Sequence, residues 1–144
     1  MVDVSLVRDM PFPAQRIWAV LEDYGNMAWT GAPRVEVIGE GIGMIRRVIM
    51  DGMDPIDEVL ESMDPAAMSF SYGIPRGLPL PVTDYHAGAS LEARDDKNTR
   101  ITWSCSCTPT DESMSEADVE NLMQNTYNGL LDSLQRYLDE GKDL

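Results

Sequence analysis

Histidine and basic residues are scarce in this chain of 144 residues. The single histidine, His86, cannot build a histidine-rich metal site, so the sequence predicts no metal centre, and no cofactor is expected. Eleven Lys and Arg residues against 25 Asp and Glu residues give a formal net charge of −14. Nucleic acids and anionic membranes attract proteins through a cationic surface, which this composition does not provide. We therefore expect no nucleic-acid partner.

Long apolar runs and cysteines are also rare. No segment approaches the roughly 20 consecutive apolar residues of a membrane span, and residues 1–5 lack the basic region and apolar run of a secretory signal. Cys105 and Cys107 lie two apart in a predicted strand, where their side chains point the same way about 6–7 Å apart, a poor span for a disulfide. They are interpreted as core residues of a protein in the reducing cytoplasm, with metal or redox use as the alternative.

The chain does contain enough apolar material for one core. Hydrophobic residues make up 43% of the sequence. A chain of about 150 residues buries roughly 70% of its unfolded surface. No repeat, low-complexity tract or linker divides it. The sequence therefore predicts a single domain over 1–144, either a monomer or a homodimer.

Alternating apolar and polar residues predict a sheet. Strands are expected over 2–6, 35–37, 44–50, 56–61, 67–72, 85–92 and 100–107, with Gly- or Pro-containing turns or polar hairpins between several of them. A short helix after Pro13 carries Ile17, Trp18 and Leu21 on one face. Consecutive hairpin-linked strands favour an antiparallel sheet.

After Pro109 the apolar residues no longer alternate every second residue but recur at intervals of three and four residues. Ser113 and Glu116 match a capping box. The apolar residues that follow recur at helical spacing: Val119, Leu122, Met123, Tyr127, Leu130, Leu131, Leu134 and Leu138. The predicted fold class is α+β, a curved antiparallel sheet of about seven strands wrapped around a long C-terminal helix. The small Ala87 and Ala89 opposite the helix predict an apolar cavity between helix and sheet.

Several motifs follow one another along nearly the whole chain. They are Ile17-Trp18-x-x-Leu21, Gly39-x-Gly41-x-Gly43-x-x-Arg46, Glu58-x-Leu60 followed by Asp64, Ser71-Tyr72, Leu78-Pro79, Tyr85, Thr99-x-Ile101-x-Trp103 and Tyr127-x-Gly129-Leu130. In this order the sequence resembles the START-related helix-grip superfamily, specifically its polyketide cyclase/dehydrase-like (SRPBCC) branch. The resemblance implies the helix-grip fold. It does not choose an activity, since the superfamily includes lipid carriers, hormone receptors, aromatic cyclases and chaperone regulators.

Glu58 shares a strand face with apolar neighbours, which places a carboxylate on the inward side. A carboxylate there must be paired, hydrogen-bonded or raised in pKa. The partner is Arg46 or Arg47 on the neighbouring strand; alternation leaves both open, and the resemblance favours Arg46. The pair is interpreted either as a structural brace or as catalytic, with Glu58 moving a proton while Arg46 and Tyr85 stabilise an enolate.

Aromatic, thioether and small residues are expected to line the cavity and to favour a flat ligand. They are Trp29, Met50, Met68, Tyr72, Ala87, Trp103, Leu122, Met123 and Tyr127. Such side chains also fill ordinary cores, and that alternative stays open. His86 lies one residue off the inward face of its strand, so we expect it to point outward and to take no part in chemistry.

The predicted function is the binding of a small, largely apolar molecule, aromatic or polyketide-like, in the central cavity. Three versions are open: an enzyme for a cyclase, dehydratase or lyase step, a carrier without chemistry, and a protein-interaction module whose acidic surface binds a basic partner. An unpaired Glu58 in a roomy, wet pocket would favour the enzyme. A Glu58–Arg46 pair in a dry pocket would favour the carrier, and a packed core without a cavity the interaction module.

Overall fold

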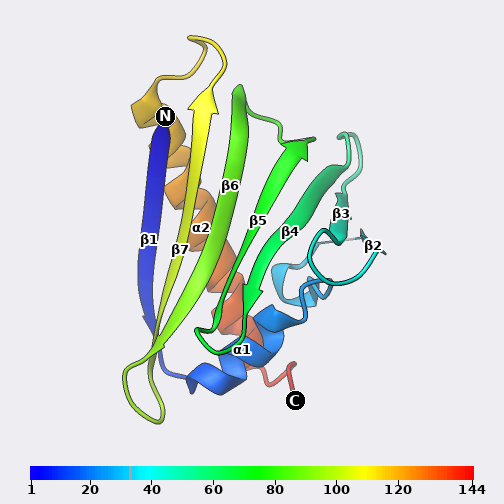
Figure 1. Cartoon of the computed structure of the whole chain (residues 1–144). Helices are drawn as coiled ribbons and strands as arrows, with labels where there is room; N and C mark the ends of the chain where they lie inside the picture. Colours follow the sequence, from blue (N-terminus) through cyan, green and yellow to red (C-terminus); the bar gives the residue numbers. More distant parts are fainter. Residues whose placement is uncertain (33) are drawn as a thin grey trace.

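Seven antiparallel strands form one sheet in the computed structural model, which describes residues 1–32 and 34–144 (Figure 1). The strands are β1 (Val2–Met10), β2 (Arg34–Ile38), β3 (Ile45–Ile49), β4 (Ile56–Asp64), β5 (Ser69–Arg76), β6 (Val82–Ala93) and β7 (Thr99–Pro109). Their order across the sheet is β1-β7-β6-β5-β4-β3-β2, so β1 pairs with the last strand and β2 lies at the opposite edge. The predicted antiparallel sheet is confirmed.

The long C-terminal helix α2 (Glu116–Asp139) runs along one face of this sheet (Figure 1). The residues that it buries are Val119, Met123, Tyr127, Leu131, Leu134 and Leu138. The Ser115 hydroxyl accepts a hydrogen bond from the Asp118 backbone N–H, and the Asp118 carboxylate accepts one from the Ser115 N–H. The capping box expected at Ser113 and Glu116 is therefore wrong by two residues. A serine followed three residues later by an acidic residue occurs again at Ser115 and Asp118, where the helix begins.

Two short helices connect β1 to β2. Helix α1 (Ala14–Glu22) has Pro13 at its N-cap and buries Ile17, Trp18 and Leu21, as the sequence predicted. A single turn, η1 (Ala28–Thr30), follows and buries Trp29. Among the helices of the described residues, none combines the length and the apolarity needed to cross a membrane.

The two faces of the sheet differ as the alternation predicted. On β6 and β7 the buried residues facing the helix include Tyr85, Ala87, Ala89, Leu91, Ile101, Trp103, Cys105 and Cys107. Both cysteines are free thiols, and burial raises the pKa of each, which suits the interpretation as core residues.

The register of β6 shifts between Thr83 and His86, where Asp84 adopts a left-handed φ of 52°. This bulge bends β6. The architecture is the expected helix-grip fold.

Candidate functional site

Arg46 on β3 and Glu58 on β4 lie directly opposite each other across the two strands. Arg46 Nε donates a hydrogen bond to Glu58 Oε1 over 2.6 Å. The Arg46 side chain is 4% exposed and that of Glu58 14%, so the buried cation depends on this partner. Burial opposes the charged form of Arg46, yet the Glu58 carboxylate holds the pKa of the guanidinium above its ordinary value. Arg46 therefore stays charged in its buried position.

Arg47, the next residue, pairs with a different carboxylate, that of Asp57. Its Nε donates to Asp57 Oδ1 over 2.6 Å, and Arg76 lies 3.2 Å from the other oxygen of this buried carboxylate. The hydrogen bond from Arg47 chiefly lowers the pKa of Asp57, against the effect of burial. Because neighbouring residues of a strand point to opposite faces, Arg46 is the inward arginine and Arg47 the outward one.

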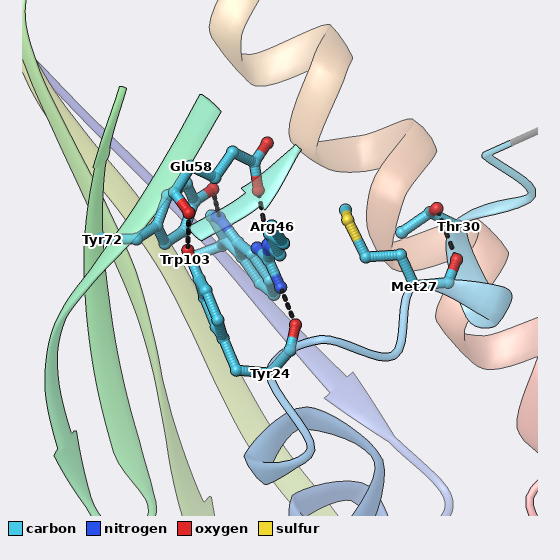
Figure 2. Close-up of polar contacts among 7 residues, drawn as sticks. All are labelled: Tyr24, Met27, Thr30, Arg46, Glu58, Tyr72 and Trp103. Atoms are coloured by element: carbon cyan, nitrogen blue, oxygen red, sulfur yellow. Dashed lines mark hydrogen bonds and ion pairs between the residues drawn. The ribbon is translucent and has the colours of Figure 1, made fainter. Parts of the chain in front are cut away.

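Tyr24, in the loop after α1, fixes the position of this ion pair (Figure 2). Its backbone carbonyl accepts a hydrogen bond from Arg46 Nη1 over 3.1 Å, and its ring centroid lies 4.0 Å from the guanidinium carbon. The Tyr24 hydroxyl donates to the backbone carbonyl of Glu58 over 3.0 Å. Sequence reasoning missed Tyr24, because a single aromatic residue in a loop belongs to no periodic pattern. Burial raises its pKa, so the phenol is a neutral donor.

A cluster of buried aromatic rings lies beside the pair, contributed by the sheet, by η1 and by α2. We call Trp29, Phe70, Tyr72, Trp103 and Tyr127 the aromatic wall. Trp103 is fully buried at its centre, with ring centroids 6.0 Å from Trp29, 5.7 Å from Phe70 and 6.3 Å from Tyr127. Its Nε1 donates to the Tyr72 hydroxyl over 3.3 Å, and the Tyr72 ring lies 5.1 Å from the Arg46 guanidinium. The wall thus contacts the ion pair through Tyr72.

Tyr85 on β6 and Tyr127 on α2 join sheet and helix through a hydrogen bond between their hydroxyls. Burial raises the pKa of both phenols above the ordinary value, so both stay neutral. Tyr85 is therefore a hydrogen-bonding group rather than a base. Either hydroxyl can be the donor of this hydrogen bond, and if Tyr127 donates, the Tyr85 proton is free to point at a ligand oxygen.

Of the nine predicted ligand-binding residues, four lie in the aromatic wall: Trp29, Tyr72, Trp103 and Tyr127. Ala87 and Met123 belong to the same buried cluster, and Leu122 packs half-buried against it. Met50 and Met68 lie near the two turns at opposite ends of β4, whose 9 residues span roughly 30 Å. Met68 nonetheless packs half-buried against the same cluster as Leu122, so a common space for Met50, Met68 and Met123 stays a prediction.

Three surface pockets are lined by neither Arg46 nor Glu58. One of about 550 Å³ covers the outer face of β5, β6 and β7, and a second of about 460 Å³ lies beside the bulge of β6. A third, of about 740 Å³, lies between the loop after α1 and the β2–β3 hairpin. None of the three is lined by Glu58, Trp103, Met123 or Tyr127. The internal cavity expected among these residues stays a prediction.

His86 is on the outer face, as expected. Its side chain is 55% exposed, and its Nδ1 lies 2.7 Å from Glu61 Oε1 in a hydrogen bond. Glu61 reaches His86 across Gly73, where a Cβ atom would lie 3.3 Å from the carboxylate. The histidine is thus on the opposite side of the sheet from the Arg46–Glu58 pair.

Comparison with known proteins agrees with this architecture. Residues 1–139 match the family described as polyketide cyclase/dehydrase and lipid transport. No curated protein matches the chain significantly. Similar solved structures include XoxI from Bacillus cereus, with a TM-score of 0.81 and 22% identity over 94% of each chain. Norcoclaurine synthase from Thalictrum flavum, in complex with dopamine and hydroxybenzaldehyde, has a TM-score of 0.74 and 16% identity over 96% of this chain and 86% of its own.

Ara h 8.0201 is a further structural neighbour, with a TM-score of 0.78 and 14% identity over 96% of this chain and 97% of its own. At such identities the neighbours show the fold alone. The family match covers nearly the whole chain and agrees with the observed sheet order and helix. The chain therefore belongs to the polyketide cyclase/dehydrase and lipid transport family, of the SRPBCC helix-grip fold.

Proposed function

We propose that this protein binds a small, largely apolar and aromatic molecule on the inner face of the sheet, next to the Arg46–Glu58 pair. The observation that carries the proposal is a charged pair set against an aromatic wall, with the Glu58 carboxylate still 14% exposed. Ligand sites in proteins combine mainly apolar walls with a few fixed polar groups. A ligand would stack against rings of the wall and place one polar group at Glu58.

Binding without chemistry is the version we favour. Two nitrogens of Arg46 are engaged, by Glu58 and by the Tyr24 carbonyl, and the Tyr85 hydroxyl is engaged by Tyr127. A Glu58 paired with Arg46 favours a carrier over an enzyme whose Glu58 is free to move a proton. A carrier role needs nothing more than this arrangement.

An enzymatic version is the second candidate, for a cyclase, dehydratase or lyase step on a carbonyl compound. It is supported by norcoclaurine synthase, a protein of the same fold whose structure holds dopamine and hydroxybenzaldehyde. In that version Glu58 would move the proton, and Arg46 and Tyr85 would stabilise the developing enolate. It requires Tyr127 to be the donor in the hydroxyl pair, so that the Tyr85 proton can reach the substrate. A protein-interaction role is the third version.

The test is an NMR titration of the ¹⁵N-labelled protein with 4-hydroxybenzaldehyde. The informative signals are the indole N–H of Trp103 and the Nε–H of Arg46, which lie at the wall and at the pair. We expect saturable shifts of both, with the His86 backbone signal unchanged on the outer face. Shifts confined to the outer face, or none at concentrations up to the solubility limit with this aldehyde and a panel of larger aromatic ketones, would contradict the proposal.

A further inference from the structure

A hollow of about 740 Å³ lies at the β2–β3 end of the sheet, and we call it the end groove. Its apolar lining is Val37, Ile42, Met44, Leu60 and Met63. Val37 is 52% exposed and Ile42 62% exposed, so large apolar side chains border the hollow in contact with water. The volume lies within the roughly 300–1,000 Å³ that small-molecule sites occupy. Figure 1 shows this hairpin at the edge of the sheet opposite β1.

The rim of the end groove is negative. Glu22, the last residue of α1, and Asp23, its C-cap, both line the groove. A helix C-terminus carries a partial negative charge and favours cations, yet the last turn of α1 has no basic residue. Within residues 1–32 and 34–144, neither carboxylate has an ion-pair partner. The edge of the groove therefore combines two carboxylates without an ion-pair partner and a helix C-terminus.

Arg46 also lies next to Tyr24, but it does not neutralise the negative charge of Glu22 and Asp23. Its guanidinium lies under the Tyr24 ring and is paired with Glu58. Tyr24 lines the end groove as well, so this residue borders both the groove and the Arg46–Glu58 pair. The groove and the pair are two different places on the inner side of the sheet.

We propose that the end groove binds a small organic cation with an apolar body, such as an arylalkylamine. The ammonium group lies between Glu22 and Asp23, where it neutralises both carboxylates and the end of α1. The body covers Ile42 and the thioethers of Met44 and Met63, whose flexible side chains fit ligands of different shapes. This site is independent of the proposed binding at Arg46 and Glu58.

Three probes with one apolar body test the charge requirement: 4-phenylbutylamine, 4-phenylbutanol and 4-phenylbutyrate. Affinities come from the methyl signals of the protein labelled at the methionine methyl groups. We expect shifts at Met44 and Met63 but not at the core residue Met123. Because each exposed ion pair contributes a modest amount, the amine should bind roughly tenfold more tightly than the alcohol, with the difference shrinking in 1 M salt. The butyrate should bind most weakly.

Matched variants distinguish the effect of the Glu22 and Asp23 charges from the effect of the net charge of the protein. Glu22→Gln with Asp23→Asn should abolish the preference for the amine and leave the affinity for the alcohol within about twofold. Asp96→Asn with Glu112→Gln removes the same two charges at exposed positions elsewhere and should keep the preference. Ile42→Ser should weaken all three probes alike. The proposal is overturned if amine and alcohol bind equally, if the control variant also loses the preference, or if Met123 shifts instead of Met44 and Met63.

Discussion

Glu58 on β4 and Arg46 on β3 face each other and share a 2.6 Å hydrogen bond, but the two side chains are not held equally firmly. Arg46 has a second anchor at the Tyr24 carbonyl, whereas the side chain of Glu58 has no other protein hydrogen bond among the described residues. Glu58 is also the more exposed member of the pair. Arg46 is therefore the more firmly held member of the pair, and Glu58 is the member with more solvent-exposed surface.

The first prediction concerns Glu58→Gln, which keeps the size of the side chain but removes its charge. Arg46 would then be a buried cation without a counter-ion, which should cost roughly 3 kcal/mol, the lower end of the cost of breaking a buried pair. For a domain of this size that is a fall in Tm of roughly 10 °C, measured by calorimetry at pH 7. A proton-transfer role would instead leave Tm unchanged and lower turnover by about 10²–10⁴-fold.

A second variant distinguishes the loss of a pair from the loss of packing. Arg46→Met combined with Glu58→Leu removes both charges and fills the space with apolar atoms. Because well-packed apolar residues can replace a buried ion pair at little cost, this double variant should be more stable than Glu58→Gln alone. An equal or lower Tm for the double variant would show that the pair is exposed to water in solution.

How far the sequence predicts this site depends on the kind of contact. Alternation along β4 placed Glu58 inward, and the structure has it paired with the inward Arg46, because strand periodicity and register are local properties. Tyr24 was missed, since the loop after α1 comes close to Arg46 only through the tertiary fold. Met50 and Met68 were both expected at the cavity, and they lie near opposite ends of β4, a separation that strand alternation does not record. The existence of a cavity is the hardest feature to predict, because the packing of rings such as Trp103 and Tyr127 depends on rotamers that no sequence pattern records.

The second prediction concerns the hydroxyl pair of Tyr85 and Tyr127. Tyr127→Phe leaves the buried Tyr85 hydroxyl without this partner, and such an unsatisfied group costs about 1–3 kcal/mol. Tyr85→Phe should cost a similar amount, while the double variant should cost clearly less than the sum of the two. Urea unfolding of all four proteins gives the coupling free energy. Additive losses would mean that each hydroxyl finds another partner in solution.

The third prediction is that His86→Asn is nearly silent. His86 is more than half exposed on the outer face, and exposed pairs such as the one with Glu61 contribute little to stability. The variant should keep its affinity for 4-hydroxybenzaldehyde within about threefold and its Tm within roughly 2 °C. Tyr72→Phe is the comparison on the inner face, since it removes the hydroxyl that accepts from Trp103. A hundredfold loss of binding in His86→Asn would place the ligand on the outer face.

The last prediction concerns pH and the contact that fastens the C-terminus to α1. Arg16 donates from Nε and Nη2 to the two oxygens of Asp143, over 2.8 and 2.9 Å, and the Asp143 side chain is only 6% exposed. The hydrogen bond from Arg16 chiefly lowers the pKa of Asp143, against the effect of burial. A carboxyl whose pKa is lower in the folded state than in the unfolded state stabilises the fold above its unfolded value near 4. That contribution is lost as the pH falls through the lower, folded value.

Asp143→Asn should therefore lower Tm at pH 7 by the order of 5 °C. The gap to the wild type should close as the pH falls from about 4 to about 2, because the wild-type carboxyl then loses its own charge. Glu140→Gln is the matched control, since its pair with Lys142 has both side chains about half exposed. It should change Tm by less than roughly 1 °C at either pH. A gap that stays constant down to pH 2 would show that Asp143 acts through packing rather than through its charge.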